Sequence, residues 1–196
     1  MGRRTETDPK TGKPVVSSAG KFMGINTIFG RDGEQGGPYM TRAWFWRLRL
    51  HTFHRPDQDE DCHDHPWDFW TFPLVSYVED VVVQVPTGKM LLSNPPQREM
   101  VNEKRRQIVP AFRISFRPAT HCHRVLGRYR KWTPVAGNAV RLNEWDKDPS
   151  PGKIVTLVWI SKPKRAWGFL KNREGEWCWV AWRDYIFNGG KDGPCQ

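Results

Sequence analysis

The chain has 196 residues, a formal net charge of +10 and many aromatic residues, among them 11 Trp and 10 Phe. This length suits one domain with tails and can bury a sizeable core. The 16 Pro and 17 Gly argue against long helices, and no apolar run is long enough for a membrane span, so we expect no membrane association. The basic charge leaves a polyanionic partner open, although it also fits a generally basic surface.

Residues 1–38 are rich in turn-forming residues and are predicted to be a flexible arm, with a short ordered piece around Phe22–Ile25. The N-terminus is polar and has no apolar segment of a secretory signal, so we expect a cytoplasmic protein. The four cysteines show no Cys-x-x-Cys spacing and indicate no disulfide framework, which favours a reducing compartment. They are Cys62, Cys122, Cys178 and Cys195.

Residues 39–188 form the predicted domain, which opens on an aromatic-rich stretch at 39–54 with the alternation of a half-buried strand. An acidic loop at 57–61 follows. It is predicted to be either a solvated turn or the source of a carboxylate that orients a metal-binding imidazole.

Two His-x-His pairs are the strongest chemical signal: His63 with His65, and His121 with His123. Residues two apart in a strand point to the same face. Neutral imidazole is a common ligand of zinc, iron, copper and nickel, so two pairs on separate strands predict a metal site inside a β-barrel. By the same alternation, Cys62 and Cys122 point away from the histidines and are predicted to pack rather than bind metal.

The remaining segments alternate short strands with turns. Strands are predicted at 69–74 and 75–85, with a turn at 86–89 and a return strand from residue 90. Further strands are expected at 107–117 and 154–160, a hairpin around 172–175, a short helix at 182–188 and a disordered tail at 189–196. Many short strands and abundant turns predict an all-β sandwich or barrel.

The first histidine pair followed by the spacing Pro118-x-x-x-x-His123 resembles the two motifs of the cupin superfamily. The string from His63 to Phe69, with Trp167-Gly168-Phe169 later, is similar to small phage or bacterial cupin-like proteins. This resemblance implies a double-stranded β-helix, or jelly roll, with one metal in the barrel. It implies His63, His65 and His123 as ligands, with His121 able to replace or join His123. For a phage protein, the expected location is the host cytoplasm.

One feature departs from the cupin pattern. The glutamate that usually follows the first pair by four or five residues is absent, since Phe69 and Trp70 stand there and Asp68 is one residue short. A three-histidine site resembles that of thiol dioxygenases within the superfamily. His51 and His54 lie outside both motifs and are expected to be surface or core residues.

Several side chains are candidates for the surroundings of the metal. Glu79 and Tyr77 share a strand face, either toward the cavity as base and acid or toward solvent. Arg113 and Arg117 form either an anion-binding wall or a solvated face. Trp67 and Phe69 are predicted to line the pocket if the chain stays extended after Pro66, and Trp44 and Trp46 to approach from a neighbouring strand.

The favoured function is a non-haem Fe(II) oxygenase acting on a small or anionic substrate, since three imidazoles leave open metal positions. Zn(II) or Mn(II) at the same ligands would support an isomerase, lyase or hydrolase. A non-catalytic jelly-roll module is another alternative, and a homodimer is left open. A nucleic-acid partner is suggested by the basic, aromatic-containing segment 104–132. Its members are Lys104, Arg105, Arg106, Arg113, Arg117, Arg124, Arg128, Tyr129, Arg130, Lys131 and Trp132.

Overall fold

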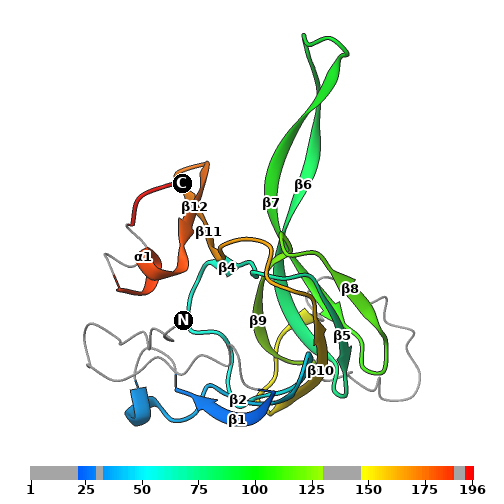
Figure 1. Cartoon of the computed structure of the whole chain (residues 1–196). Coiled ribbons are helices and arrows are strands. Elements are labelled where there is room, and N and C mark those ends of the chain that lie inside the picture. Colours follow the sequence, from blue (N-terminus) through cyan, green and yellow to red (C-terminus); the bar gives the residue numbers. More distant parts are fainter. Residues whose placement is uncertain (1–21, 30–32, 130–146, 188–192) are drawn as a thin grey trace.

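Two antiparallel sheets make up most of the computed structural model, which describes residues 22–29, 33–129, 147–187 and 193–196 (Figure 1). In spatial order, the first sheet contains β1 (Met23–Ile28), β2 (Met40–Phe45), β3 (Leu48–Phe53), β10 (Ile154–Ile160), β5 (Phe69–Pro73) and β8 (Ser115–Arg117). The second contains β12 (Glu176–Ala181), β11 (Gly168–Arg173), β4 (Cys62–His63), β9 (Cys122–Arg128), β6 (Tyr77–Leu91) and β7 (Gln97–Val109). A 3-10 turn (Gly33–Gly36) and the helix α1 (Trp182–Phe187) complete the described elements.

Eight successive strands, β3 to β10, form a jelly roll. Their pairing is nested, because β6 pairs with β7, β5 with β8, β4 with β9 and β3 with β10. This is the pattern of one long hairpin wrapped into two facing sheets, with strand orders β3-β10-β5-β8 and β4-β9-β6-β7. The predicted all-β double-stranded β-helix is therefore confirmed, and the fold is cupin-like.

The sheets extend beyond the jelly roll at one edge each. Strands β1 and β2 continue the first sheet past β3, so the segment predicted as an arm contributes a strand where a short ordered piece was expected. Strands β11 and β12 continue the second sheet past β4 and join in the predicted hairpin, where Glu174 and Gly175 have positive φ angles of 54° and 99°. The predicted short helix is present as α1.

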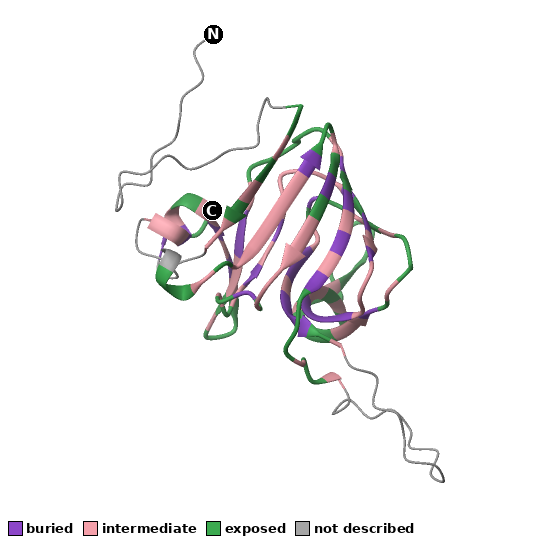
Figure 2. Cartoon of the chain, turned by 90° about the horizontal axis from the view of Figure 1, so that it is seen from below, coloured by how far each residue is buried: buried purple, intermediate pink, exposed green. Residues whose placement is uncertain are grey.

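Side chains from both sheets meet in the barrel interior. Tyr77 of β6 and Val109 of β7 pack with Val125 of β9 and Ile154 of β10. Residues of β10 and β5 alternate between buried and more exposed along each strand, as expected for strands with one face on a core. Figure 2 shows strands on which buried segments, in purple, alternate with more exposed ones. The face of β10 that carries Ile154 therefore points toward the second sheet.

Strands β6 and β7 continue past the barrel as a projecting two-stranded ribbon (Figure 1). The predicted turn at 86–89 is wrong, because β6 runs on to Leu91 and pairs with β7 on both sides of this segment. A register shift between Pro86 and Met90 and a positive φ of 85° at Gly88 accommodate these residues as a bulge. The ribbon ends in the exposed apolar residues Met90, Leu91 and Leu92.

The cysteines divide into two pairs. Cys178 of β12 forms a disulfide with Cys195, so the prediction of no disulfide is wrong. The C-terminal segment lies alongside β12, where the amide of Gln196 donates to the carbonyl of Trp179. The spacing of the cysteines in the sequence does not predict this arrangement. Cys62 and Cys122 are free and buried.

Among the residues that the structure describes, no helix combines the length and the hydropathy that a membrane-spanning segment requires.

Candidate metal centre

Three histidines converge on the inner face of the second sheet. His63 ends β4 and stands directly opposite His123 of β9 in the antiparallel register, while His65 lies two residues past the end of the strand. The ring centroids of His63 and His65 are 5.2 Å apart, and that of His123 lies 5.1 Å from each of the others. Each histidine offers one ring nitrogen to a group whose atoms all lie within 4.8 Å of one another.

The nitrogen spacing fits ligands of a single metal ion. The Nε2 atoms of His65 and His123 are 2.9 Å apart. Metal–imidazole bonds are about 2.0–2.1 Å long, so two nitrogens at right angles on one ion are separated by roughly 3 Å. The predicted set of His63, His65 and His123 is thus brought together with spacing suited to a divalent cation.

Glu79 of β6 supports His123 from behind. Its Oε2 lies 2.8 Å from Nδ1 of His123, which assigns the proton to Nδ1 and leaves Nε2 free to bind a metal. Its Oε1 accepts from Nε2 of Gln107 at 2.6 Å and from Nη2 of Arg117 at 2.9 Å. Glu79 is 0% exposed. Burial alone would raise its pKa, but the hydrogen bond and charge of His123 and the charge of Arg117 outweigh burial and lower the pKa to about 2.

Burial keeps the neighbouring imidazoles neutral. It lowers the pKa of His63 to about 4 and that of His121 to about 3, and it holds the pKa of His65 well below its usual value. A positive charge on the neighbouring His123 would lower each of these pKa values further. Metal binding requires the neutral ring, so these histidines are ready to bind metal at neutral pH.

The acidic loop supplies a second supporting carboxylate. Asp57 is 8% exposed, and its Oδ2 lies 4.0 Å from Nδ1 of His63. The carboxylate is held in place by the hydroxyl of Tyr39 and by the amide of Val125, which donates to Oδ2 at 2.7 Å. Asp57 is therefore not part of a solvated turn, but at 4.0 Å it makes no hydrogen bond to His63 and acts on that ring through its charge alone.

The residues between the histidines anchor the loop. Asp64 is 3% exposed and accepts from the amide of Gly168 at 2.7 Å, from Nε1 of Trp179 at 2.9 Å and from Arg165. Asp68 accepts from the amide of Ala119 at 2.9 Å and pairs with Lys164, so it belongs to neither histidine cluster. Sequence reasoning missed the anchoring role of Asp64, since its partners lie about a hundred residues away.

His121 belongs to a second cluster, with Glu79 and His123. Nη1 of Arg117 lies 3.1 Å from Nε2 of His121, and Nη2 of the same guanidinium pairs with Glu79. The guanidinium of Arg117 already neutralises the Glu79 carboxylate in this second cluster, and its positive charge repels a metal cation. The three-histidine cluster is therefore the better metal site, and His121 lies at its border, with its ring 5.1 Å from that of His123.

The other predicted polar residues take different places. Tyr77 is 5% exposed within an apolar cluster, and its pKa is raised well above the usual value by burial and by Glu79. The solvent-facing alternative for Glu79 and Tyr77 is thus wrong. Arg113 is exposed in the turn before β8, whereas Arg117 turns inward to Glu79, so the two do not form one anion-binding wall.

Aromatic rings surround the histidines. Phe69 is 7% exposed, and its ring lies 4.8 Å from that of His65. Trp67 packs against the cluster of Phe69, Val158 and Ile160 rather than against a histidine ring. Two rings near the C-terminus, Trp167 and Phe169, lie 6.2 Å and 5.8 Å from His63.

The predicted approach of Trp46 is wrong. Its backbone turns at a φ of 52° between β2 and β3, and its side chain is 51% exposed against Trp159. Trp44 is buried, and its approach to the histidines stays a prediction. The prediction assumed one continuous strand, in which Trp44 and Trp46 would face the same side. The turn at Trp46 ends that alternation, so the two side chains point in different directions.

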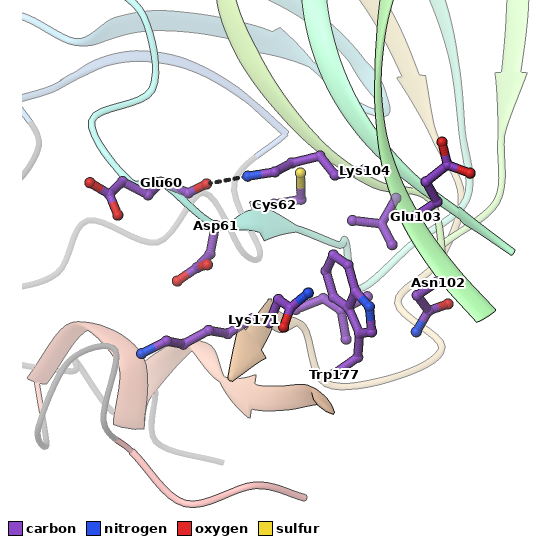
Figure 3. Close-up of a pocket in the computed structure, with 11 residues that line it drawn as sticks. Glu60, Asp61, Cys62, Asn102, Glu103, Lys104, Lys171 and Trp177 are labelled. Atoms are coloured by element: carbon purple, nitrogen blue, oxygen red, sulfur yellow. Dashed lines mark hydrogen bonds between the residues drawn. The ribbon is translucent and has the colours of Figure 1, made fainter. Parts of the chain in front are cut away.

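A hollow of about 470 Å³ lies on the opposite face of the second sheet. Glu60, Lys104, Lys171 and Trp177 line it together with Cys62 (Figure 3). Because Cys62 alternates with His63, this hollow is separate from the histidine cluster. Cys62 and Cys122 are buried, as expected for packing residues.

The basic segment is divided among different environments. Arg106 pairs with Asp80 at 3.1 Å, Arg105 pairs with Glu103 at 2.9 Å, and Arg117 lies inside the barrel. Arg130, Lys131 and Trp132 lie outside the described residues. By register, Lys104, Arg106 and Arg124 share the outer face of the second sheet, and a nucleic-acid partner stays a prediction.

Comparisons with known proteins assign the chain to no family. No family model matches the chain, and no curated protein matches it. Among solved structures, it is similar to DMSP lyase DddQ from Ruegeria pomeroyi DSS-3, with 15% sequence identity and a TM-score of 0.30. The match covers 74% of this chain and 50% of that protein, so the chain spans half the length of the lyase. The jelly-roll assignment therefore depends on the nested strand pairing itself.

Proposed function

We propose that the chain is a metal-dependent cupin-type enzyme whose divalent metal is held by His63, His65 and His123. The observation that carries this proposal is the 2.9 Å separation of two Nε2 atoms, combined with a carboxylate on Nδ1 of His123. An imidazole that binds a metal through one nitrogen and a carboxylate through the other is the usual arrangement in metalloproteins.

We favour Fe(II) and an oxygenase reaction on a small or anionic substrate. Three protein ligands leave open positions, and iron in such a site would supply redox chemistry next to the bound substrate. Around it, the rings of Phe69, Trp167 and Phe169 exclude water and favour a substrate with an apolar or flat body.

The roles of Glu79 and Tyr77 follow from their contacts. Glu79 already accepts three hydrogen bonds, so we assign it the task of orienting His123 rather than the general-base role predicted from the sequence. Tyr77 keeps its proton and contributes a buried phenol beside Glu79. A catalytic-acid role for Tyr77 remains a proposal that its burial makes less favourable.

Zn(II) or Mn(II) at the same residues is the second candidate. Three histidines with an open position are also the donor set of catalytic zinc sites, which support hydrolysis, isomerisation or elimination by Lewis-acid action. The neutral histidines described above suit zinc as well as iron.

Metal analysis of protein prepared without a histidine tag tests the site. We expect about one metal ion per chain after anaerobic purification, and loss of most of it in His63→Ala, His65→Ala and His123→Ala. The matched control is His54→Ala, because His54 lies 2.9 Å from Thr41 and outside the cluster. Loss of metal in the control with retention in His123→Ala would refute the assignment.

The same preparations separate the candidate functions. Absence of stoichiometric metal even after anaerobic Fe(II) loading would favour a non-catalytic binding module. Metal-dependent oxygen consumption in the presence of substrate candidates supports the oxygenase, whereas tight zinc binding without oxygen consumption supports the second candidate.

A further inference from the structure

The first sheet contains cations but no acids. Its six strands read MGINTI, MTRAWF, LRLHTF, IVTLVWI, FWTFP and SFR, without a single Asp or Glu. They carry Arg42, Arg49, Arg117 and His51. Of these, Arg117 crosses to the second sheet and pairs with Glu79. The other three side chains need a separate explanation.

The register points Arg42, Arg49 and His51 into the barrel. His51 stands opposite Arg42 on one side and opposite Thr156 on the other, and Arg49 stands opposite Val158. Directly opposed residues in an antiparallel pair share a face. Thr156 and Val158 are buried and lie on the same face of β10 as Ile154, which packs against the second sheet.

These inward cations have no acidic partner among the described residues. Arg49 is 8% exposed, and its Nη1 donates to the carbonyls of Trp46 at 2.5 Å and Leu48 at 3.3 Å. Arg42 donates from Nε to the neutral side-chain oxygen of Asn26 at 3.4 Å, and its guanidinium lies 6.0 Å from the ring centroid of Trp44, so neither partner is an acid. Nε2 of His51 is buried and has no hydrogen-bond partner in the described structure.

The three groups also act on one another. Burial, followed by the charges of Arg42 and Arg49, lowers the pKa of His51 to about 3, and Arg49 adds to the lowering of the pKa of Arg42. Arg49 stands opposite Val158, which packs with Phe69, and the ring of Phe69 lies 4.8 Å from that of His65, so the cluster lies near the histidine site. The acids of that site, Glu79 and Asp57, are already engaged by other donors.

We propose that Arg42, Arg49 and His51 bind an oxyanion, the carboxylate or phosphate group of the substrate, inside the barrel beside the histidine cluster. The buried guanidinium of Arg49 and the partly buried one of Arg42 are costly without an acidic partner, and a bound oxyanion removes that cost. The guanidinium groups offer forked donors that match its geometry, and the neutral imidazole adds one N–H donor. The position beside a metal rests on the proposed function, whereas oxyanion binding itself does not.

The test is anion binding by the whole protein, in metal-free and metal-loaded form. The probes are acetate, succinate and inorganic phosphate, followed by calorimetry and thermal shift at constant ionic strength maintained with chloride. We expect saturable binding by the wild type and a loss of affinity of about tenfold or more in Arg42→Gln and Arg49→Gln. Arg47→Gln is the matched control, since Arg47 lies over the exposed ring of Trp46, at 5.3 Å, and should bind like the wild type.

Each outcome decides one question. A wild type that shows no saturable binding of any probe overturns the oxyanion site, as do folded Arg42→Gln and Arg49→Gln variants that bind as the wild type does. If Arg49→Gln fails to fold, anion binding by the wild type and by Arg42→Gln still tests the oxyanion site. Metal content is measured on the same samples, so metal without anion binding refutes only this site, and anion binding without metal refutes only the proposed function. The preference between succinate and phosphate identifies the substrate's anionic group.

Discussion

Glu79 is the residue whose replacement tests the architecture of the site most directly. The Glu79→Gln variant keeps the volume of the side chain but removes its charge, so no cavity contributes to the result. The guanidinium of Arg117 then loses its partner at 2.9 Å while its side chain is only 15% exposed. Removing one member of a buried ion pair costs about 3–5 kcal/mol, which is the expected fall in the free energy of unfolding.

Metal affinity should fall as well. Glutamine can still approach Nδ1 of His123, but without a negative charge it orients the imidazole less firmly and lowers its basicity. Loss of such a supporting carboxylate typically weakens metal binding about 10–100-fold. The assays are urea unfolding of the metal-free protein and competition with a chelator for the metal.

Two further variants isolate the cause. Asp80→Asn removes the neighbouring acid on the outer face, whose partner Arg106 has a side chain 43% exposed, and should cost about 1 kcal/mol or less. In Glu79→Gln combined with Arg117→Gln, part of the stability should return, with a coupling of about 1–3 kcal/mol. This account of Glu79 is refuted if the free energy of unfolding of Glu79→Gln lies within about 1 kcal/mol of the wild-type value and the variant binds metal equally well.

Three more outcomes are expected. The pKa of His63 is lowered from 6.5 to about 4, so between these values the unfolded state binds more protons and stability rises with pH. The free energies of urea unfolding of the metal-free protein at pH 6.5 and pH 5 should differ by about 1.5 kcal/mol from this residue, and His63→Gln should remove the difference. Trp67→Ala should cost about 3 kcal/mol because it opens the cluster around Phe69, with metal retained; an undiminished stability together with altered ligand affinity would instead make Trp67 a pocket residue. Reduction of the Cys178–Cys195 bond, verified by peptide mapping, should lower stability by roughly 3 kcal/mol as judged from its loop length, and an unchanged melting temperature would contradict this.

The histidine cluster was predictable because strand alternation is a local property. His63 and His65 are two residues apart, and so are His121 and His123, which is enough to assign a common face. The spacing from Pro118 favoured His123 over His121, and the structure places His123 directly opposite His63.

The partners of those histidines were not predictable in the same way. Glu79 meets Gln107 and Arg117 because β6 pairs with β7 and the two sheets face each other, and neither register is written in a local pattern. The proposed oxyanion site of Arg42, Arg49 and His51 was even harder to predict from the sequence. Arg42 and Arg49 look like ordinary half-exposed strand residues until the six strands of their sheet are assembled and no acid is found among them.

The nested strand pairing also has a consequence for how the chain folds. The pair β6–β7 joins neighbouring segments, whereas β5–β8, β4–β9 and β3–β10 join segments progressively farther apart along the sequence. Closing each outer pair costs less entropy once the inner pair has formed, so the barrel can assemble as a zipper from the ribbon toward β3 and β10. On this order we expect β6–β7 to form first and His63 and His123 to meet at the third step, so the proposed metal site would be completed late in folding.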